Sequence, residues 1–345
     1  MRVLGFTPQR LHNVGSKSNA IVARAFKLQF GVADIPHPDK ASRGGEDAYF
    51  ICDRALGVAD GVGGWAESGV NPKDYSQGLM DVAKAYYTEG DVAEAVGGSG
   101  APESIEGTYA TGMGEATGTA ASAGTAVIDD SGAMYAEASR TQKSSMEALK
   151  RAHAETQKPG SSTACIVQID LETGALDSAN LGDSGFVVIR DGQVVMRSEF
   201  QEHFFDCPFQ LASLRFVPET DQATDAAVLT GQVQTGDLIV VGSDGLFDNV
   251  PIDDILLTVH AIGDEGSVSK AGAIAEALGE VAFANSQDPE YESPYALEAR
   301  KQGYELSFFE KIQAAKFTEG GLQLGQINGG KADDISVVVA LVEQA

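Results

Sequence analysis

Strand-like runs occur at both ends of this chain, and helix-like segments are inserted among them. The runs are rich in apolar and β-branched residues and are bounded by Pro, Gly and Asp, which is typical of buried strands. Asp191-Gly192 joins two of these runs and is a strong hairpin signal, so antiparallel pairing is expected. The predicted strands are Leu28–Val32, Ala48–Cys52, Leu56–Ala59, Thr163–Ile169, Ala175–Gly182, Phe186–Arg190, Gln193–Arg197, Asp237–Gly242 and Ile335–Val342.

Helical spacing appears between these strands. Within Tyr75–Tyr87, the residues Leu79, Val82, Ala83 and Tyr86 recur on one face of a helix, so this segment is predicted to pack against a sheet. The other predicted helices are Ser144–Gln157, Ile252–Ile262 and Ser267–Asn285. Strands, inserted helices and strands again predict an α+β protein and not alternating βαβ units.

The composition narrows the class of partner. The formal net charge is −26 at pH 7, so nucleic-acid backbones and anionic membrane surfaces are not expected partners. No apolar run approaches the roughly 20 residues needed to cross a bilayer, so no membrane span is predicted. The cysteines Cys52, Cys165 and Cys207 lie far apart without CxxC spacing, which indicates neither a disulfide framework nor a zinc site.

The first residues differ from the rest of the chain in charge. Five basic residues precede the first acid, Asp34, and serines and apolar residues lie among them. This composition resembles an organelle transit peptide, predicted at residues 1–26, with a mature protein that begins near Phe26. An irregular N-terminus that leads into the first strand is the alternative, and the protein would then be cytoplasmic.

A second unusual segment lies between the first two predicted helices. Residues 91–140 are rich in Gly, Ala, Ser and Thr and contain eight acidic residues against one basic residue, Arg140. Such a segment buries too little apolar surface to offset its ordering entropy, so a mostly disordered insertion is predicted. A short loop with extra helical turns is the alternative.

Acidic residues stand at the ends of the hydrophobic strands. Asp60 and Asp244 are each followed by Gly, which allows a ligand to approach the backbone closely. Glu46-Asp47 and Asp333-Asp334 each place two acids next to a strand. Any one of these sites could be a turn, because Asp and Gly dominate turns. Four such sites in one chain favour a shared function instead.

Converging carboxylates repel one another unless a cation lies between them. Mg²⁺ and Mn²⁺ prefer oxygen ligands, bind through a few carboxylates and retain water molecules. Two such ions roughly 3.5–4 Å apart can generate a bridging hydroxide and clamp a phosphoryl group for in-line attack. The acids at the strand ends therefore favour a two-metal hydrolase.

Six stretches form an ordered set of motifs: Glu46-Asp47, Val58–Gly64, Gly160–Ala164, Asn180–Ser184, Gly242–Asn249 and Lys331–Ser336. Taken together, they resemble the PP2C class of metal-dependent protein phosphatases, also called the PPM family. The resemblance extends over roughly Leu28–Val342, apart from the acidic insertion. Within the family, Val62–Trp65 and Gln201–Gln210 look most like the PTC7-type branch, whose members are often mitochondrial or plastid proteins.

The resemblance implies a fold and an activity. The fold is a four-layer α-β-β-α sandwich of two antiparallel sheets flanked by helices, in one domain over residues 27–345. The activity is hydrolysis of phosphoserine and phosphothreonine in proteins with Mn²⁺ or Mg²⁺, and a monomer is the simpler expectation. Two alternatives stay open: a phosphohydrolase of small phosphorylated metabolites, and a non-catalytic pseudophosphatase that binds phosphoproteins.

The resemblance also implies a role for each metal-binding residue. Asp60 would bridge two ions, and the carbonyl oxygen of Gly61 would bind one of them. Asp244 and Asp333 would complete the protein ligands of the other ion. Asp183 would help to form a third, weaker metal site near Asp244, with an ordinary turn acid as the alternative.

Further residues around the expected centre receive supporting roles. Glu46 and Asp47 would hold metal-bound waters, and Asp334 would support the ligands without touching a metal. Arg43 is the candidate phosphate clamp, because a guanidinium can donate two parallel hydrogen bonds to phosphate oxygens. The family arginine usually stands four residues before the glutamate, whereas Arg43 stands three before Glu46, so a solvated surface arginine is the alternative.

The position after Asp60-Gly61 departs from the family pattern. Many members have a histidine there that can protonate the leaving group, whereas this chain has Val62. The proton would then come from a metal-bound water or from another side chain. His203 is a candidate acid, with a hydrogen-bonded structural histidine as the alternative.

Overall fold

The computed structural model describes residues 25–89, 143–262, 269–305 and 327–345, together with four short strands outside these ranges. These strands form two pairs, β4 (Val127–Ile128) with β5 (Met134–Tyr135) and β16 (Lys316–Thr318) with β17 (Gly321–Gln323). The predicted insertion at residues 91–140 lies outside the described residues except for β4 and β5. The predicted transit peptide also lies outside them, apart from its last two residues.

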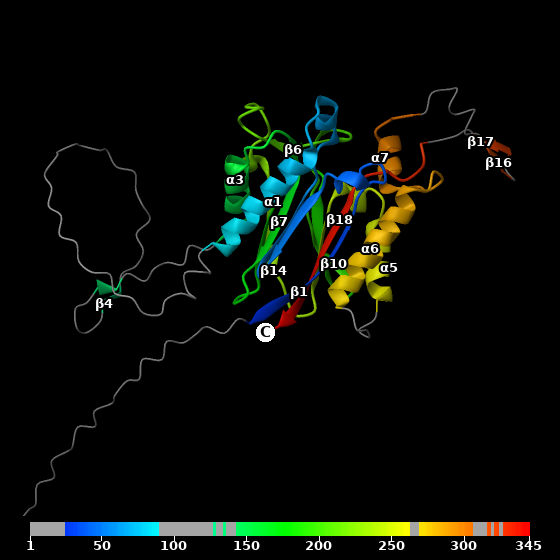
Figure 1. Cartoon of the computed structure of the whole chain (residues 1–345). Coiled ribbons are helices and arrows are strands. Elements are labelled where there is room, and N and C mark those ends of the chain that lie inside the picture. The colour runs from blue at the N-terminus through cyan, green and yellow to red at the C-terminus, as the bar shows by residue number, and fades with distance from the viewer. Residues whose placement is uncertain are drawn as a thin grey trace, which may run out of the picture.

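The first sheet brings the two ends of the described chain together (Figure 1). Its five strands are antiparallel and follow the order β1 (Phe26–Ile35), β18 (Ile335–Gln344), β15 (Leu238–Gly242), β9 (Gly185–Arg190) and β10 (Gln193–Arg197). β1 pairs with β18 from Phe26 opposite Gln344 to Ile35 opposite Ile335. The acids before β18 therefore lie beside the loop that follows β1.

The second sheet also has five antiparallel strands. They follow the order β14 (Ala227–Gln232), β8 (Ala175–Leu181), β7 (Ala164–Ile169), β3 (Ala55–Ala59) and β2 (Ala48–Cys52). The chain passes from this sheet to the first one between β8 and β9, through a short turn at residues 182–184. Asp183 lies in that turn.

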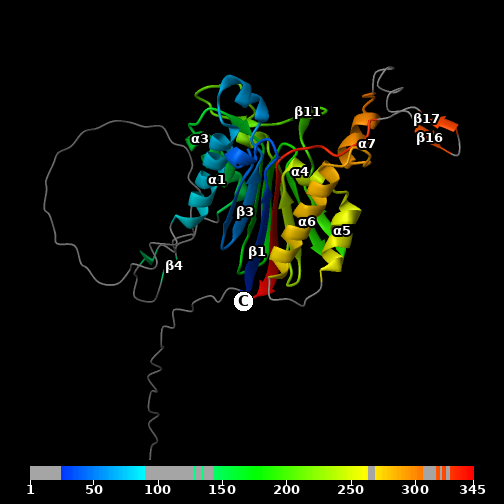
Figure 2. The same ribbon diagram turned by 45° about the vertical axis from the view of Figure 1, so that its right-hand side comes forward.

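The two sheets and the helices on their outer faces form four layers (Figures 1 and 2). Three buried apolar clusters lie between these layers. Side chains such as Val58, Phe186 and Val241 fill the space between the sheets. The helices α1 (Pro72–Thr88) and α3 (Ser145–Glu155) pack on the second sheet, with Leu79 and Leu149 in that cluster. The first sheet is covered by three helices, α4 (Asp244–Phe247), α5 (Ile252–Ala261) and α6 (Lys270–Ser286).

Local sequence signals explain where these helices begin. The hydroxyl of Ser144 accepts a hydrogen bond from the backbone of Glu147, and Ser269 accepts one from Gly272, so each caps a helix N-terminus. In the same way Ser293 begins α7 (Pro294–Lys301), where Pro occupies the first helical position. The remaining short elements are η1 (Ala41–Arg43), η2 (Gly63–Ser68), η3 (Ala223–Asp225), β6 (Ser161–Ser162), β11 (Glu202–Phe204), β12 (Cys207–Pro208) and β13 (Leu211–Ala212).

The predicted α+β class and the four-layer sandwich are confirmed, and each predicted strand and helix is present with shifted ends at most positions. The strand β14 and the helix α7 were not predicted from the sequence. In β14 only alternate residues are partly buried, and α7 has eight residues, so both give weak periodic signals. No helix in the described part of the chain is long and apolar enough to cross a membrane.

Candidate metal centre

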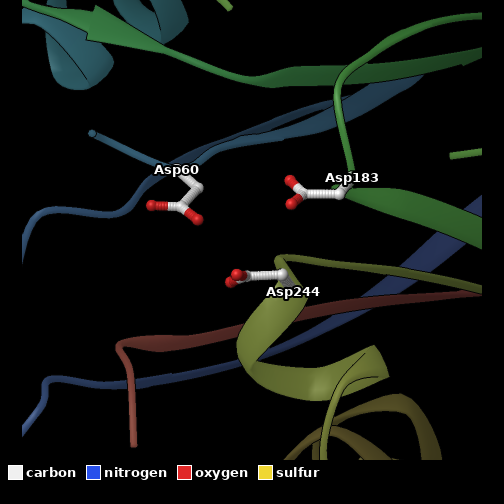
Figure 3. A group of neighbouring side chains, drawn as sticks. All are labelled: Asp60, Asp183 and Asp244. Carbon is white, nitrogen blue, oxygen red and sulfur yellow. The ribbon is translucent and has the colours of Figure 1, made fainter. Parts of the chain in front are cut away.

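Carboxylates from both sheets meet at one end of the sandwich. Asp60 follows β3 in the second sheet, Asp244 follows β15 in the first sheet, and Asp183 lies in the turn that connects the sheets. Each offers a carboxylate oxygen, and these oxygens lie within 4.8 Å of one another. Figure 3 shows the three side chains around one common space. Antiparallel sheets packed face to face thus bring together residues that are far apart in sequence.

The backbone around Asp60 is held by the segment before β7. The amide of Asp60 donates to Thr163 Oγ1 at 3.1 Å, and the Thr163 amide donates back to the Asp60 carbonyl at 3.0 Å. Thr163 Oγ1 lies 2.7 Å from Ser184 Oγ, which ties Asp60 to the turn of Asp183. A Cβ atom on Gly61 would lie 2.5 Å from the Glu46 carbonyl oxygen, so this position requires glycine.

Asp244 begins the short helix α4. Its Oδ1 atom is buried and has no hydrogen-bond partner among the described residues, whereas its Oδ2 atom lies 2.5 Å from Lys331 Nζ. At the next residue, Gly245, a Cβ atom would lie 2.0 Å from the carbonyl oxygen of Asp334. The Asp-Gly pattern is therefore a packing requirement as well as a chemical one.

The two acids before β18 have different surroundings. Asp334 is buried and accepts backbone N–H groups from His37 at 2.7 Å and from Glu46 at 2.8 Å. Asp333 is partly exposed, and its Oδ1 atom accepts the Asp334 amide at 2.9 Å and Lys40 Nζ at 3.2 Å. Asp334 therefore positions the loop before β2, and Asp333 lies outside the group formed by Asp60, Asp183 and Asp244.

Glu46 and Asp47 are both buried beside this group. Glu46 forms an ion pair with Lys40, whose Nζ lies 2.6 Å from Oε2. Both carboxylate oxygens of Asp47 are buried without a hydrogen-bond partner in the described part of the chain. Buried polar atoms are normally hydrogen-bonded, so an unpaired buried carboxylate indicates that a ligand, ion or water completes it.

Burial and mutual repulsion raise the pKa of several of these acids. Burial is the main cause for Asp60, and the negative charges of Asp244 and Asp47 add to it. Burial also raises the pKa of Asp47, Asp183 and Asp333. Such carboxylates are costly when ionised and unpaired, and a divalent cation would remove that cost. The donor set, which consists of carboxylate oxygens, fits Mg²⁺ or Mn²⁺.

Three residues of the centre were not predicted as functional. Burial raises the pKa of Asp248 to about 7. Asp248 is the C-cap residue of α4, four residues after Asp244, and this spacing could have indicated that the two acids lie on one side. Lys331 contacts both of these acids, and Lys40 contacts Glu46, Asp333 and Asp334. Burial by itself would raise the pKa of Asp244. The nearby Lys331 ammonium outweighs burial, so the pKa of Asp244 is lowered.

The two remaining candidates lie at exposed positions. Arg43 ends η1, and its Nη2 atom lies 3.6 Å from Glu46 Oε1, with 47% of the side chain exposed. His203 lies in β11, where Nε2 is 3.0 Å from Asp221 Oδ2 and the ring stacks on Phe209 at 4.2 Å. The structure therefore brings Arg43 next to a predicted metal-site residue and fixes His203 through two contacts outside the group of acids.

A cavity of about 450 Å³ adjoins the centre. Asp183 and Asp248 form part of its wall, so it opens beside the metal-binding candidates. Apolar and aromatic side chains form much of the rest, including Phe205 and Tyr295, whose ring centroids lie 5.2 Å apart. Concave sites with a few polar groups next to an acidic centre are typical places for substrate binding.

Comparisons with known proteins agree with this geometry. The family model described as Stage II sporulation protein E (SpoIIE) matches residues 105–283. "Probable protein phosphatase 2C 26" of Arabidopsis thaliana is 34% identical over 318 residues, which cover 91% of this chain and 84% of the relative. "Protein phosphatase PTC7 homolog" of Homo sapiens is 33% identical over 313 residues, which cover 87% of this chain and 80% of the relative.

A solved structure supports the same assignment. The X-ray structure of the photosystem II phosphatase PBCP is 32% identical in sequence and superposes with a TM-score of 0.66, over 91% of this chain and 98% of that chain. The resemblance inferred from the motifs is thereby confirmed. The chain belongs to the PP2C family of protein serine/threonine phosphatases.

Proposed function

We propose that Asp60, Asp244 and Asp333, with the carbonyl oxygen of Gly61, hold two divalent cations, Mn²⁺ or Mg²⁺, with which the protein hydrolyses phosphoserine and phosphothreonine. The observation that carries this proposal is the convergence of buried carboxylates from both sheets at one point. Bound ions would activate water as the nucleophile and neutralise charge on the phosphoryl group. The carboxylate of Asp183 lies in the same group as those of Asp60 and Asp244.

The protein's own residues have supporting tasks in this proposal. Asp47 offers two unpaired, buried oxygens and would orient water at the centre. Glu46 would do the same from its position beside Lys40. Arg43, exposed and directed toward Glu46, would bind the phosphate oxygens of the incoming substrate.

His203 receives a structural role in our proposal. It is held between Asp221 and Phe209, and these contacts support a function in fixing the β11–β12 hairpin. Val62 cannot donate a proton, so the leaving group would take its proton from water. This assignment differs from the alternative in which His203 is the general acid, and the pH dependence of its variants separates the two.

The adjoining cavity supports a phosphoprotein as the substrate. Its volume of about 450 Å³ would admit side chains that flank the phosphorylated residue, and Phe205 forms part of its wall. Phe205→Ala should therefore lower kcat/KM for a phosphopeptide and leave kcat/KM for an aryl phosphate unchanged. Phe204→Ala is the matched control, because that neighbouring ring is 66% exposed and does not line the cavity. Equal losses with both substrates would favour a small-metabolite phosphohydrolase.

The decisive test of the function uses the full chain and defined phosphopeptides. Release of phosphate should require Mn²⁺ or Mg²⁺, should stop on addition of EDTA and should be abolished by Asp244→Asn. Metal-independent turnover would contradict the assignment. A folded protein that binds phosphopeptides and metal without turnover would be a pseudophosphatase.

We also propose import into a mitochondrion or plastid. The basic residues before Asp34 support it, and one similar structure is named a photosystem II phosphatase. Sequencing the N-terminus of the protein isolated from cells would test this. A mature N-terminus near Phe26 is the expected result, whereas retention of Met1 would argue for the cytoplasm.

A further inference from the structure

The ammonium group of Lys331 lies inside the acidic centre. Its Nζ atom contacts Asp244 Oδ2 at 2.5 Å, Asp248 Oδ2 at 3.0 Å and Asp206 Oδ1 at 3.1 Å. The Tyr295 ring faces it with its centroid at 5.2 Å, within the range of a cation–π contact. Only 17% of the lysine side chain is exposed. These neighbours form a complete binding site for one cation.

The backbone of Lys331 is fixed as firmly as its side chain. Its amide donates to Asn249 Oδ1 at 2.9 Å, and Asn249 Nδ2 donates to the Lys331 carbonyl at 2.9 Å. Asn249 is fully buried, and its own carbonyl accepts Asn285 Nδ2 at 2.9 Å. The backbone of Lys331 is therefore held by the segment that directly follows α4, unlike that of a lysine in a mobile surface loop.

The two oxygens of Asp244 serve different neighbours. Oδ1 is buried with no hydrogen-bond partner among the described residues, and Asp244 shares a common space with Asp60 and Asp183. Oδ2 is occupied by Lys331. A divalent ion that took its ligands from Asp244 Oδ2 and Asp248 Oδ2 would compete with Lys331 for both oxygens.

We propose that Lys331 is a resident cation that takes the place of a third divalent ion on the face formed by Asp183, Asp244 and Asp248. The chain consequently holds two divalent ions and not three. A metal ion at that face would have to displace a tethered ammonium and then lie beside its charge, which is unfavourable in a partly buried site. This inference rests on the proposed two-ion centre and specifies its composition.

The test counts bound ions and does not depend on turnover. The full chain is dialysed against saturating Mn²⁺, and the Mn²⁺ bound per chain is measured by elemental analysis and by calorimetry. We expect two ions for the natural sequence and for Lys331→Arg, which keeps the charge. We expect three ions for Lys331→Met, and two again for the double variant Lys331→Met/Asp248→Asn.

A matched control removes a different lysine near the same cavity. Lys301 lines the cavity, is 72% exposed and pairs with Glu298, so Lys301→Met should leave two ions bound. Circular dichroism establishes that each variant is folded. Three ions in the natural protein, or two in folded Lys331→Met, would overturn the role of Lys331. Fewer than two ions in every variant would overturn the proposed metal centre itself.

Discussion

The carboxylate of Asp334 accepts the backbone N–H of Glu46 at 2.8 Å, although 288 positions separate the two residues in the chain. The bond is buried, and it fixes the loop that carries Glu46 and Asp47 against the start of β18. The pairing of the first and last strands in one sheet makes this contact possible. Asp334 thus helps to fix where Glu46 and Asp47 lie.

Asp334→Ala should destabilise the fold. The substitution leaves the amides of His37 and Glu46 without their acceptor, so we expect the free energy of unfolding to fall by about 2–4 kcal/mol. Urea denaturation measures it. Asp333→Ala is the control. Because Asp333 is partly exposed, its substitution should lower the free energy of unfolding by less. Equal losses in the two variants would contradict the positioning role of Asp334.

Asp60→Asn should separate stability from activity. In the metal-free protein Asp60 is destabilised as an anion, so its neutral replacement should keep or raise Tm. The stabilisation by Mn²⁺ should shrink, because a ligand is lost. Activity should fall roughly a thousandfold, since the ions provide several kcal/mol of transition-state stabilisation. Asp81→Asn, at an exposed position on α1, should alter none of these values. A large loss of metal-free Tm in Asp60→Asn would contradict this account.

The metal-free protein should become less stable as the pH rises from 5 to 8. Burial raises the folded-state pKa of Asp60 and Asp183, and that of Asp248 reaches about 7. Aspartates in the unfolded chain have a pKa of about 3.9. Between that pH and the folded-state pKa values, the folded protein therefore binds more protons than the unfolded protein and loses stability as the pH rises. Asp244, whose pKa is lowered, contributes a constant stabilisation across this range.

Thermal melts in EDTA at several pH values measure this effect. Asp248→Asn should reduce the slope, and saturating Mn²⁺ should reverse it, because the metal binds the ionised carboxylates. If the metal-free protein instead gained stability between pH 5 and 8, the folded-state pKa values of these acids would not be raised, and the account would be wrong.

The order of strands and helices could be predicted from the sequence because apolar periodicity is a local property. The acids at the strand ends could also be recognised, since Asp60 and Asp244 each combine a hydrophobic run with a following glycine. Lys331 and Lys40 could not, because a lysine stem can point toward solvent or inward, and only the fold decides. Acidic partners of both lysines come from distant parts of the chain, Asp206 for Lys331 and Asp333 for Lys40.

His203→Ala should have a small effect on catalysis. The ring stacks on Phe209 and pairs with Asp221, so its removal should cost about 1 kcal/mol of stability and less than threefold in kcat. The pH dependence of kcat should keep its shape. A hundredfold fall in kcat, with loss of the limb on the alkaline side, would identify His203 as the general acid instead.

Arg43→Ala should weaken binding of the phosphate group in every substrate. Charge-assisted hydrogen bonds contribute about 1.5–3 kcal/mol, so kcat/KM should fall roughly 10- to 100-fold for phosphopeptide and aryl phosphate alike. Arg43→Lys should recover only part of this loss, because an ammonium keeps the charge without the two parallel donors of a guanidinium. Arg215→Ala is the control, since that guanidinium lies over Phe216 outside the acidic group. If Arg43→Ala retained full kcat/KM with both substrates, Arg43 would be a solvated surface residue, and its contact with Glu46 at 3.6 Å would have no part in phosphate binding.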